Sequence, residues 1–193
     1  MSRLDSMLDN VSSEIDKAVQ HLKSGDVIAY PTESVFGFGC DPFNASAVAS
    51  ILQLKKRPLG KGFIVVGSHF EQVEHLVQPI GPHALAQVLS SWPGPVTWVF
   101  PASEEAPKWI TGDYTTIAVR VSSHPVIRQL CDQFGGPIVS TSANMRGQIP
   151  ARTKDTVEMV FGGDLKMIVS GKTGDLKKPT TIRDAISGEV LRA

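Results

Sequence analysis

The sequence predicts an α/β (α+β) protein: a single domain over residues 1–193, with helices on the faces of a twisted sheet of mixed parallel and antiparallel strands. Short apolar runs rich in β-branched residues alternate with segments of helical periodicity along the chain. Some expected strands are separated by two helices and others by hairpin-like links, which favours a mixed sheet. No repeat, low-complexity tract or shift in composition marks a second domain. The core is expected to span about residues 13–192.

Helices are expected where apolar residues recur at helical spacing between capping and breaking residues. In the first, Ser13 and Asp16 form a capping pair and Gly25 ends the helix. In the second, Asn44 is the N-cap and Pro58 ends the helical pattern. The expected helices cover residues 13–24, 45–57, 70–77, 82–91, 125–135 and 154–161.

Strands are expected where short apolar runs lie between glycine and proline residues. They cover residues 27–30, 63–66, 96–100, 116–121, 138–140 and 167–169. Residues 181–192 are expected to form a hairpin about Ser187-Gly188. Loops over 32–42 and 141–150 follow two of the strands, and the Gly, Lys and Thr content of residues 171–179 predicts a flexible stretch.

The composition is that of an ordinary globular protein, with 41% hydrophobic and 20% charged residues. Nineteen basic residues balance nineteen acidic ones, so no field of the whole molecule attracts nucleic acid or membrane. The sequence has neither an N-terminal apolar stretch nor a long apolar run, which predicts a cytoplasmic protein. Cys40 and Cys131 lie among apolar residues and are expected to be buried free thiols, in keeping with a reducing compartment.

Four cations gather at the predicted end of the second helix: Lys55, Lys56, Arg57 and Lys61. Attraction of cations to a helix C-terminus explains one or two of them as solvated residues. It does not explain Lys61, which lies beyond the helix in a loop with Gly60 and Gly62, where the backbone can approach a ligand. In a chain without net charge, such a cluster favours a polyphosphate.

Two other features follow predicted strands. The segment Ser140-Thr141-Ser142-Ala143-Asn144 offers hydroxyl and amide groups for phosphate, ribose or an amino acid, although Ser, Thr and Asn also stabilise ordinary turns. Arg120 closes the strand run Thr116-Ile117-Ala118-Val119, where a guanidinium suits a carboxylate and a surface salt bridge is the alternative.

Several familiar chemistries are not supported. The run Gly37-x-Gly39 fails as a dinucleotide fingerprint because Pro42 occupies its third position, and Gly171-Lys172-Thr173 fails as a phosphate loop because Lys166 replaces its first glycine. The five histidines have no metal-ligand spacing, so no protein metal site is expected. The sequence contains no Gly-x-Ser-x-Gly elbow of a hydrolase.

Six short motifs occur in order along the chain. They are Pro31-Thr32-Glu33 with Phe36-Gly37-x-Gly39, Lys55-x-Arg57-x-x-x-Lys61, Trp92-Pro93-Gly94-Pro95-Val96-Thr97, Ala118-Val119-Arg120, Ser140-x-Ser142-Ala143-Asn144 and Thr180-Thr181-Ile182-Arg183-Asp184. Together they resemble the YrdC-type threonylcarbamoyl-AMP synthase family from about residue 27 to residue 192. Each motif alone is weak, whereas six in order are specific, and the length is similar to the short bacterial form (TsaC/RimN-like).

The resemblance implies a YrdC/RibB-like fold whose sheet encloses a concave, positively lined cavity. It implies a nucleotidyltransferase that converts L-threonine, bicarbonate and ATP, with Mg2+ accompanying the ATP, into L-threonylcarbamoyladenylate and pyrophosphate. No tightly bound cofactor is implied. The product serves threonylcarbamoyladenosine formation in tRNA, so the implied partners are tRNA threonylcarbamoyl-transfer proteins, with contact to tRNA as a further candidate and no membrane.

The resemblance also implies roles by position. Lys55, Arg57 and Lys61 would hold the triphosphate and are the catalytic candidates. The rest of the nucleotide would be held by Thr116, Ser142, Asn144 and Arg192. Threonine would be held by Thr32, Arg120, Ser140 and Thr180, with Arg120 on its carboxylate.

Two positions depart from the family pattern. Val66 stands where many relatives have histidine, and Thr180 replaces the usual serine, keeping its hydroxyl and adding a methyl. Two alternative functions remain open at this point. One is an RNA-binding ribosome or rRNA maturation factor that uses the same cations; the other is a different nucleotide-dependent carbamoylation in the same cleft.

Overall fold

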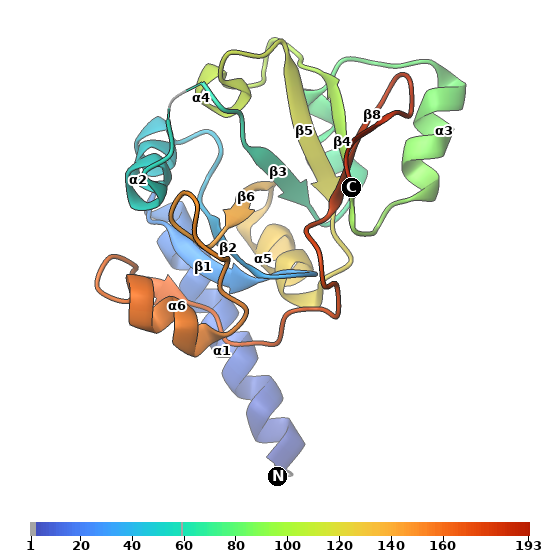
Figure 1. The fold of residues 1–193 in the computed structure, drawn as a ribbon. Helices are drawn as coiled ribbons and strands as arrows, with labels where there is room; N and C mark the ends of the chain where they lie inside the picture. The colour runs from blue at the N-terminus through green and yellow to red at the C-terminus, as the bar shows by residue number, and fades with distance from the viewer. Residues whose placement is uncertain (1–2, 59) are drawn as a thin grey trace.

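The computed structural model describes residues 3–58 and 60–193, and in these ranges the strands join into one mixed sheet (Figure 1). The strand order is β7-β1-β2-β6-β3-β5-β4-β8-β9. β1 and β7, β3 and β5, and β4 and β8 pair in parallel, and the other neighbours are antiparallel. The predicted α/β class and its mixed sheet are therefore confirmed.

The strands are β1 (Ile28–Pro31), β2 (Phe36–Gly39), β3 (Ile64–Gly67), β4 (Val96–Pro101), β5 (Thr116–Val121), β6 (Ile138–Ser142), β7 (Met167–Ile168), β8 (Thr181–Asp184) and β9 (Val190–Arg192). The helices are α1 (Arg3–Lys23), α2 (Ala45–Lys55), α3 (Pro82–Ser90), α4 (Lys108–Thr111), α5 (Pro125–Phe134) and α6 (Lys154–Phe161), with short 3-10 turns η1 (Phe70–Gln72) and η2 (Glu74–Leu76).

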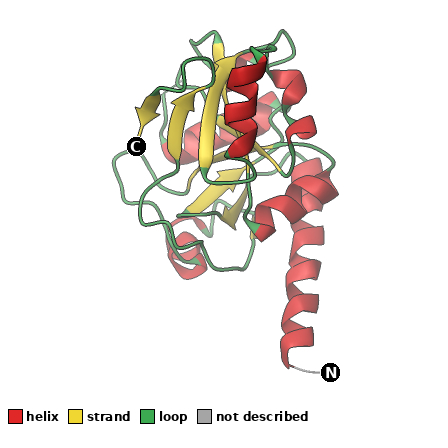
Figure 2. Ribbon diagram, turned by 90° about the vertical axis from the view of Figure 1, so that its right-hand side faces the viewer, coloured by secondary structure: helices red, strands yellow, loops and turns green. Residues whose placement is uncertain are grey.

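Apolar residues cover both faces of the sheet, as the alternation of side chains along β3 shows. Val65 belongs to a large core cluster with α2, whereas Val66 belongs to a second cluster with α1 and α5. Figure 2 shows helices on both sides of the strands. Each fully buried side chain such as Leu22 stabilises the fold by about 2 kcal/mol. None of the described helices combines the length and apolar character needed to cross a membrane.

Several predicted boundaries are wrong. α1 begins at Arg3, so Ser13 and Asp16 lie within the helix and do not cap it. Leu4, Met7, Leu8 and Val11 recur at helical spacing before them, and this period predicts the longer helix that a start at Ser13 overlooks. The predicted loop over 32–42 contains β2, and the predicted helix over 70–77 is two 3-10 turns. α4 was not predicted, because four residues are too few to show a period.

Other local predictions are confirmed. Asn44 caps α2 by accepting a hydrogen bond from the Ala47 amide. β8 and β9 form the predicted terminal hairpin, whose Gly188 has a φ of +75°, in the left-handed region that favours glycine. Cys40 and Cys131 are buried free thiols, and burial raises the pKa of both.

Candidate functional site

The hollow that gathers most of the predicted site residues, called the main cavity below, has a volume of about 320 Å³ and lies on one face of the sheet. Alternate residues of adjoining strands form its floor, because side chains two apart on a strand point to the same face. Ile64 pairs in register with Ala118 on β5 and with Ser140 on β6, and all three line the hollow. The site thus lies on the sheet face, not only at strand ends. The other polar and charged lining residues are Thr32, Ser34, Arg57, Arg120, Thr141, Ser142, Thr180 and Arg192.

Arg120 lies in this floor and is 3% exposed. Its Nη2 lies 3.3 Å from Oε2 of Glu33, and its Nη1 donates to the Thr180 hydroxyl at 3.3 Å. The alternative of a surface salt bridge is therefore wrong: the ion pair is buried. Glu33 and Arg120 are close enough to form an ion pair, but their geometry is not that of a hydrogen bond. Among the described residues, Nε of Arg120 also has no hydrogen-bond partner. Arg120 therefore retains N–H groups for a ligand.

Glu33 was not assigned a role from the sequence. It does not line the cavity, although its neighbours Thr32 and Ser34 do, so it supports Arg120 from behind the wall. Its Oε1 accepts from the Ser122 hydroxyl, which in turn accepts from the His124 amide. The signals in the sequence were its place directly after an apolar strand and its membership of the Pro31-Thr32-Glu33 motif.

Residues 171–176 pass over this network. The amides of Gly174 and Leu176 donate to the carbonyls of Thr32 and Glu33, at 2.9 and 3.2 Å. A side chain at position 174 would meet the Glu33 carbonyl at 2.6 Å, so only glycine permits this approach. Nε2 of His124 lies 3.1 Å from the carbonyl oxygen of Lys172, and burial lowers the pKa of the His124 imidazole. The flexibility predicted for residues 171–179 stays a prediction.

The C-terminal hairpin closes another side of the cavity. Thr180 is buried, and its hydroxyl lies 3.4 Å from that of Thr97 as well as accepting from Arg120. Arg192 donates from Nη2 to the Thr180 carbonyl at 2.8 Å and lines the same hollow. Burial, followed by the charge of Arg120, lowers the pKa of Arg192.

Three further predicted residues lie on the wall or floor. The Thr32 hydroxyl donates to the Val35 carbonyl at 2.7 Å and so also stabilises the turn between β1 and β2. Ser140 is buried in the floor. The Ser142 hydroxyl donates to Oδ1 of Asn144 at 2.5 Å. Gly37 faces Ser142 across β2 and β6, and a side chain there would meet the Thr141 carbonyl at 3.3 Å.

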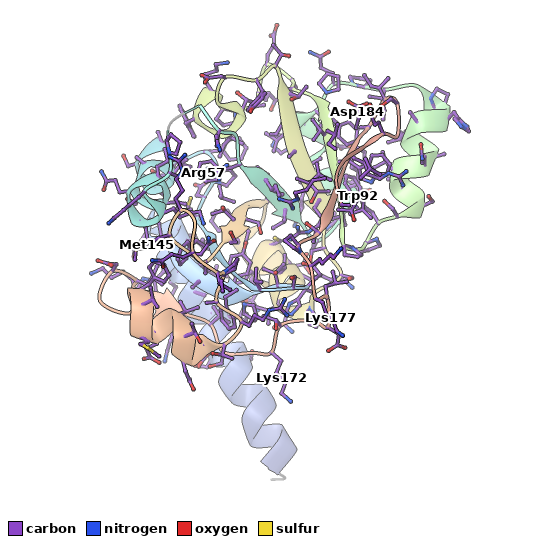
Figure 3. The ribbon with its side chains drawn as sticks, in the orientation of Figure 1. Arg57, Trp92, Met145, Lys172, Lys177 and Asp184 are labelled. Carbon is purple, nitrogen blue, oxygen red and sulfur yellow. The ribbon has the colours of Figure 1, made fainter. Side chains whose placement is uncertain are left out.

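Arg57 lines the cavity beside Gly62, just before the start of β3, whereas Arg120 pairs in register with Val66 near the end of β3. Figure 3 shows Arg57 near the end of α2. Its Nη2 donates to the Gly62 carbonyl at 2.7 Å, and its guanidinium lies 5.1 Å from the Phe63 ring centroid. None of the ion pairs in the described parts of the chain includes Arg57, and its buried Nε has no partner there. Its charge is therefore not neutralised within the protein.

Lys55 is buried and does not line the cavity. Its ammonium donates to the carbonyls of Ser142 and Asn144 and to Oδ1 of Asn144, the last at 3.3 Å. Burial, followed by the charge of Arg57, lowers its pKa to about 8. In this structure the three protons of Lys55 hold the loop after β6.

The remaining predicted residues lie outside the main cavity. Lys61 is exposed and lines an adjoining hollow of about 350 Å³, hereafter the second hollow. Asn144 is bound to its own loop, donating to the carbonyls of Met145 and Gln148. Thr116 opens β5 beside Pro101 and is partly buried. The structure thus gathers seven of the predicted residues at the main cavity: Thr32, Arg57, Arg120, Ser140, Ser142, Thr180 and Arg192.

The site contains few carboxylates. Glu33 is the carboxylate that pairs with Arg120, and it lies outside the lining of the cavity. Within the described ranges, no group of three or more His, Cys, Asp or Glu residues could hold a metal ion. The residues on the wall therefore suit anions and hydroxyl-bearing ligands.

The comparisons with known proteins agree with this picture. The Sua5/YciO/YrdC family, described as telomere recombination, matches residues 20–193. A protein of Coxiella burnetii (strain RSA 493 / Nine Mile phase I) named threonylcarbamoyl-AMP synthase is 52% identical over 185 residues, covering 96% of this chain and 100% of that protein. A protein of the same name from Xanthomonas axonopodis pv. citri is 46% identical over 181 residues, covering 93% and 97%.

Solved structures show the same fold. P. abyssi Sua5 complexed with L-threonine superposes with a TM-score of 0.83 at 33% identity, covering 88% of this chain and 50% of that one, so this chain spans half the length of that protein. E. coli YciO superposes with a TM-score of 0.82 at 25% identity, covering 92% and 87%. The family model matches residues 20–193, and the chain covers the full length of a relative that is 52% identical to it. The chain therefore belongs to the Sua5/YciO/YrdC family.

Proposed function

We propose that this chain is a threonylcarbamoyl-AMP synthase. It forms L-threonylcarbamoyladenylate and pyrophosphate from L-threonine, bicarbonate and ATP, for threonylcarbamoyladenosine formation in tRNA. The observation that carries the proposal is the C. burnetii relative of this name, which is 52% identical and is covered from end to end. The cavity supports it, since one side offers donors for a carboxylate and the other offers an unneutralised cation.

The threonine end of the site is the floor around Arg120. Its free N–H groups bind the α-carboxylate, and the hydroxyls of Thr32, Ser140 and Thr180 surround the rest of the amino acid. A guanidinium whose direction is fixed by Glu33 and Thr180 loses little freedom when it binds, which favours a defined carboxylate geometry.

The nucleotide end extends from Ser142 and Arg192 to Arg57. Arg57 and Lys61 neutralise the triphosphate, and Ser142 and Arg192 hold the nucleoside part. Lys55 and Asn144 act by shaping the loop after β6, because their polar groups bond to that loop. Thr116, which lies apart from the cavity lining, contributes least.

The reaction needs alignment more than covalent help. The threonine amine adds CO2, supplied by bicarbonate, and loses a proton to become a carbamate. A carbamate oxygen then attacks the α-phosphorus, and the bond to the β-phosphate oxygen breaks as pyrophosphate leaves with the electron pair. Positioning and charge neutralisation supply most of the catalysis of such transfers. Mg2+ enters as part of the MgATP substrate, held by phosphate oxygens and water, and no residue is assigned to it.

We also place the enzyme in the cytoplasm, where its buried free thiols stay reduced, and upstream of proteins that transfer threonylcarbamoyl to tRNA. The alternative of an RNA-binding factor relies on the same cations. Titration of the chain with RNA and with ATP in one buffer separates them: tight binding of RNA with no binding of ATP would favour the alternative.

The test of the proposed function is direct. Purified chain with MgATP, bicarbonate and L-threonine should yield threonylcarbamoyl-AMP and pyrophosphate, detected by mass spectrometry. L-Valine, which matches threonine in shape but has no hydroxyl, should be a far poorer substrate, because polar groups of the site would be left unpaired. Absence of product in all conditions, or equal turnover of valine, would refute the assignment.

A further inference from the structure

One buried histidine has no part in the proposed reaction. His124 is 8% exposed and does not line the main cavity. It stands at the N-cap of α5, where Ser, Thr, Asp and Asn are preferred because their side chains accept hydrogen bonds from the first amides of the helix. The His124 side chain makes no capping hydrogen bond. The helix alone therefore does not explain why a histidine stands at this position.

The imidazole of His124 bonds to another segment of the chain. Its Nε2 lies 3.1 Å from the Lys172 carbonyl oxygen, and because a carbonyl can only accept, Nε2 carries the proton and donates. Nδ1 is buried and has no hydrogen-bond partner in the described parts of the chain. The bond to the Lys172 carbonyl is thus the one hydrogen bond that this side chain makes with the described residues.

Residues 171–176, hereafter the strap, pack closely against the turn between β1 and β2. The amides of Gly174 and Leu176 donate to backbone carbonyls of that turn. Gly171 has a φ of +148°, and a side chain there would meet the Pro31 ring at 2.9 Å. Within the described ranges, the imidazole at position 124 is the one side chain that donates a hydrogen bond to the strap backbone.

These contacts form a closed chain around the amino-acid end of the main cavity. The His124 amide donates to the Ser122 hydroxyl, which donates to the Glu33 carboxylate. Glu33 pairs with Arg120, and Arg120 donates to the Thr180 hydroxyl. From Thr180 the backbone leads back through the strap to the carbonyl that accepts from the imidazole. Arg120 and Thr180 are therefore placed by contacts that begin and end at one residue.

We propose that His124 is a positioning residue for the amino-acid end of the main cavity. It holds the strap on the turn between β1 and β2, and so fixes the Glu33 backbone, the direction of the Arg120 guanidinium and the approach of the chain to Thr180. Neither His124 nor the strap lines the cavity, so both act through other residues. The proposal rests on the proposed function, in which Arg120 binds the threonine carboxylate. It predicts an effect on threonine and none on ATP, because the cations of the nucleotide end belong to other segments.

The test compares two amide side chains of different length at position 124. Glutamine reaches about as far as Nε2 of histidine and keeps an N–H donor for the Lys172 carbonyl, whereas asparagine is one methylene shorter. Asparagine is also a good N-cap, so His124→Asn removes the bond to the strap without weakening the start of α5. His21→Asn is the matched control, since His21 bonds to Asp26 and lies outside the cavity lining.

Steady-state formation of threonylcarbamoyl-AMP and amide hydrogen exchange are measured on the full chain. His124→Asn should raise the KM for threonine about three- to tenfold, as expected for the loss of one hydrogen bond, with kcat and the KM for ATP within about twofold of the wild type. His124→Gln and His21→Asn should leave all three within about twofold. The amides of Gly174 and Leu176 should exchange about tenfold faster in His124→Asn, and glutamine should restore their protection.

A second variant approaches the same contact from the strap. Gly174→Ala places a methyl group against the Glu33 carbonyl, lifts the strap from the turn and should raise the KM for threonine at least as much. This variant keeps the test decisive where His124→Asn does not fold, because an unchanged KM for threonine in Gly174→Ala would overturn the inference.

An unchanged KM for threonine in a folded His124→Asn would overturn the inference as well. So would an equal rise in His124→Asn and His124→Gln, because reach to the strap would then be irrelevant. A lower melting temperature with unchanged KM and unchanged exchange would make His124 purely structural and would also overturn it. A wild type that forms no threonylcarbamoyl-AMP would instead refute the proposed function, and the exchange rates would still decide whether His124 holds the strap.

Discussion

The two ends of the main cavity hold their arginines in different ways. Arg120 is almost fully buried and is paired with a buried carboxylate, whereas Arg57 is half-buried and bonds only to a backbone carbonyl. At the amino-acid end, Glu33 neutralises the charge of Arg120. A ligand there is bound by hydrogen bonds from N–H groups whose direction is fixed. At the nucleotide end the charge is left for phosphate oxygens. The comparison predicts that similar substitutions at the two ends have different consequences.

The largest effect should come from Glu33→Ala. It leaves the Arg120 cation buried without a counter-charge, which costs about 3–5 kcal/mol of the free energy of unfolding. Guanidinium denaturation of the variant and of the wild type measures this loss in the free energy of unfolding. Glu33→Ala combined with Arg120→Met should recover a large part of the loss, because the buried charge is then gone as well. A loss below about 1 kcal/mol in Glu33→Ala would contradict the buried-pair description.

Arg57→Ala should affect the substrate and leave stability nearly unchanged. Loss of one charge-assisted contact should weaken ATP binding by about 1.5–3 kcal/mol. Lys61→Ala should act in the same direction. Calorimetric titration with MgATP measures both, with Lys56→Ala as the control that should change little. Wild-type affinity in both variants would remove them from the triphosphate site.

A smaller and more selective effect is expected for Arg120→Lys. Lysine keeps the positive charge beside Glu33 but cannot reproduce the planar fork, so the KM for threonine should rise about tenfold, or 1.4 kcal/mol. The KM for ATP should stay within about twofold. Melting temperature is measured on the same preparation, and a loss of stability with an unchanged threonine KM would make Arg120 purely structural.

The last prediction concerns pH and Lys55. Its pKa is lowered to about 8 from an ordinary 10.5, so the unfolded chain binds this proton more tightly between these values. The free energy of unfolding should therefore rise with pH in this window, by less than about 1.4 kcal/mol per pH unit. Measuring the free energy of unfolding of the wild type and of Lys55→Met at pH 7.5 and pH 9.5 isolates the contribution of Lys55. The free energy of unfolding of the wild type should exceed that of Lys55→Met by more at pH 9.5 than at pH 7.5. A smaller difference at pH 9.5 would contradict the prediction.

Local sequence patterns predicted most elements but not their neighbours. The amphipathic period of α5 and the apolar run of β5 are visible without tertiary context. The pairing of β4 with β8, which brings Thr180 to Arg120, joins segments some eighty residues apart, and no local pattern encodes it. β2 was not predicted because its glycines are typical of a loop. Gly39 is glycine for a packing reason instead: a side chain there would lie 2.5 Å from the Tyr30 ring.

The candidate site was predicted better as a set of residues than as an arrangement. The resemblance named Arg120, Ser140 and Thr180, and the structure brings them together. It gave Lys55 and Lys61 one role, whereas the structure places Lys55 under the loop after β6 and Lys61 in the second hollow. Glu33 lay within a motif, but its partner is set by the strand order and was beyond reach of the sequence alone.

The walls of the main cavity come from segments that are far apart in the chain, from Thr32 to Arg192. Such non-local contacts form late and slow the folding of a domain, because chain entropy must be lost before they are gained. A partly folded chain therefore has no complete site, and ATP and threonine can bind only the native state. Substrate should accordingly raise the melting temperature with its concentration, so that well-supplied cells would hold more of this protein folded.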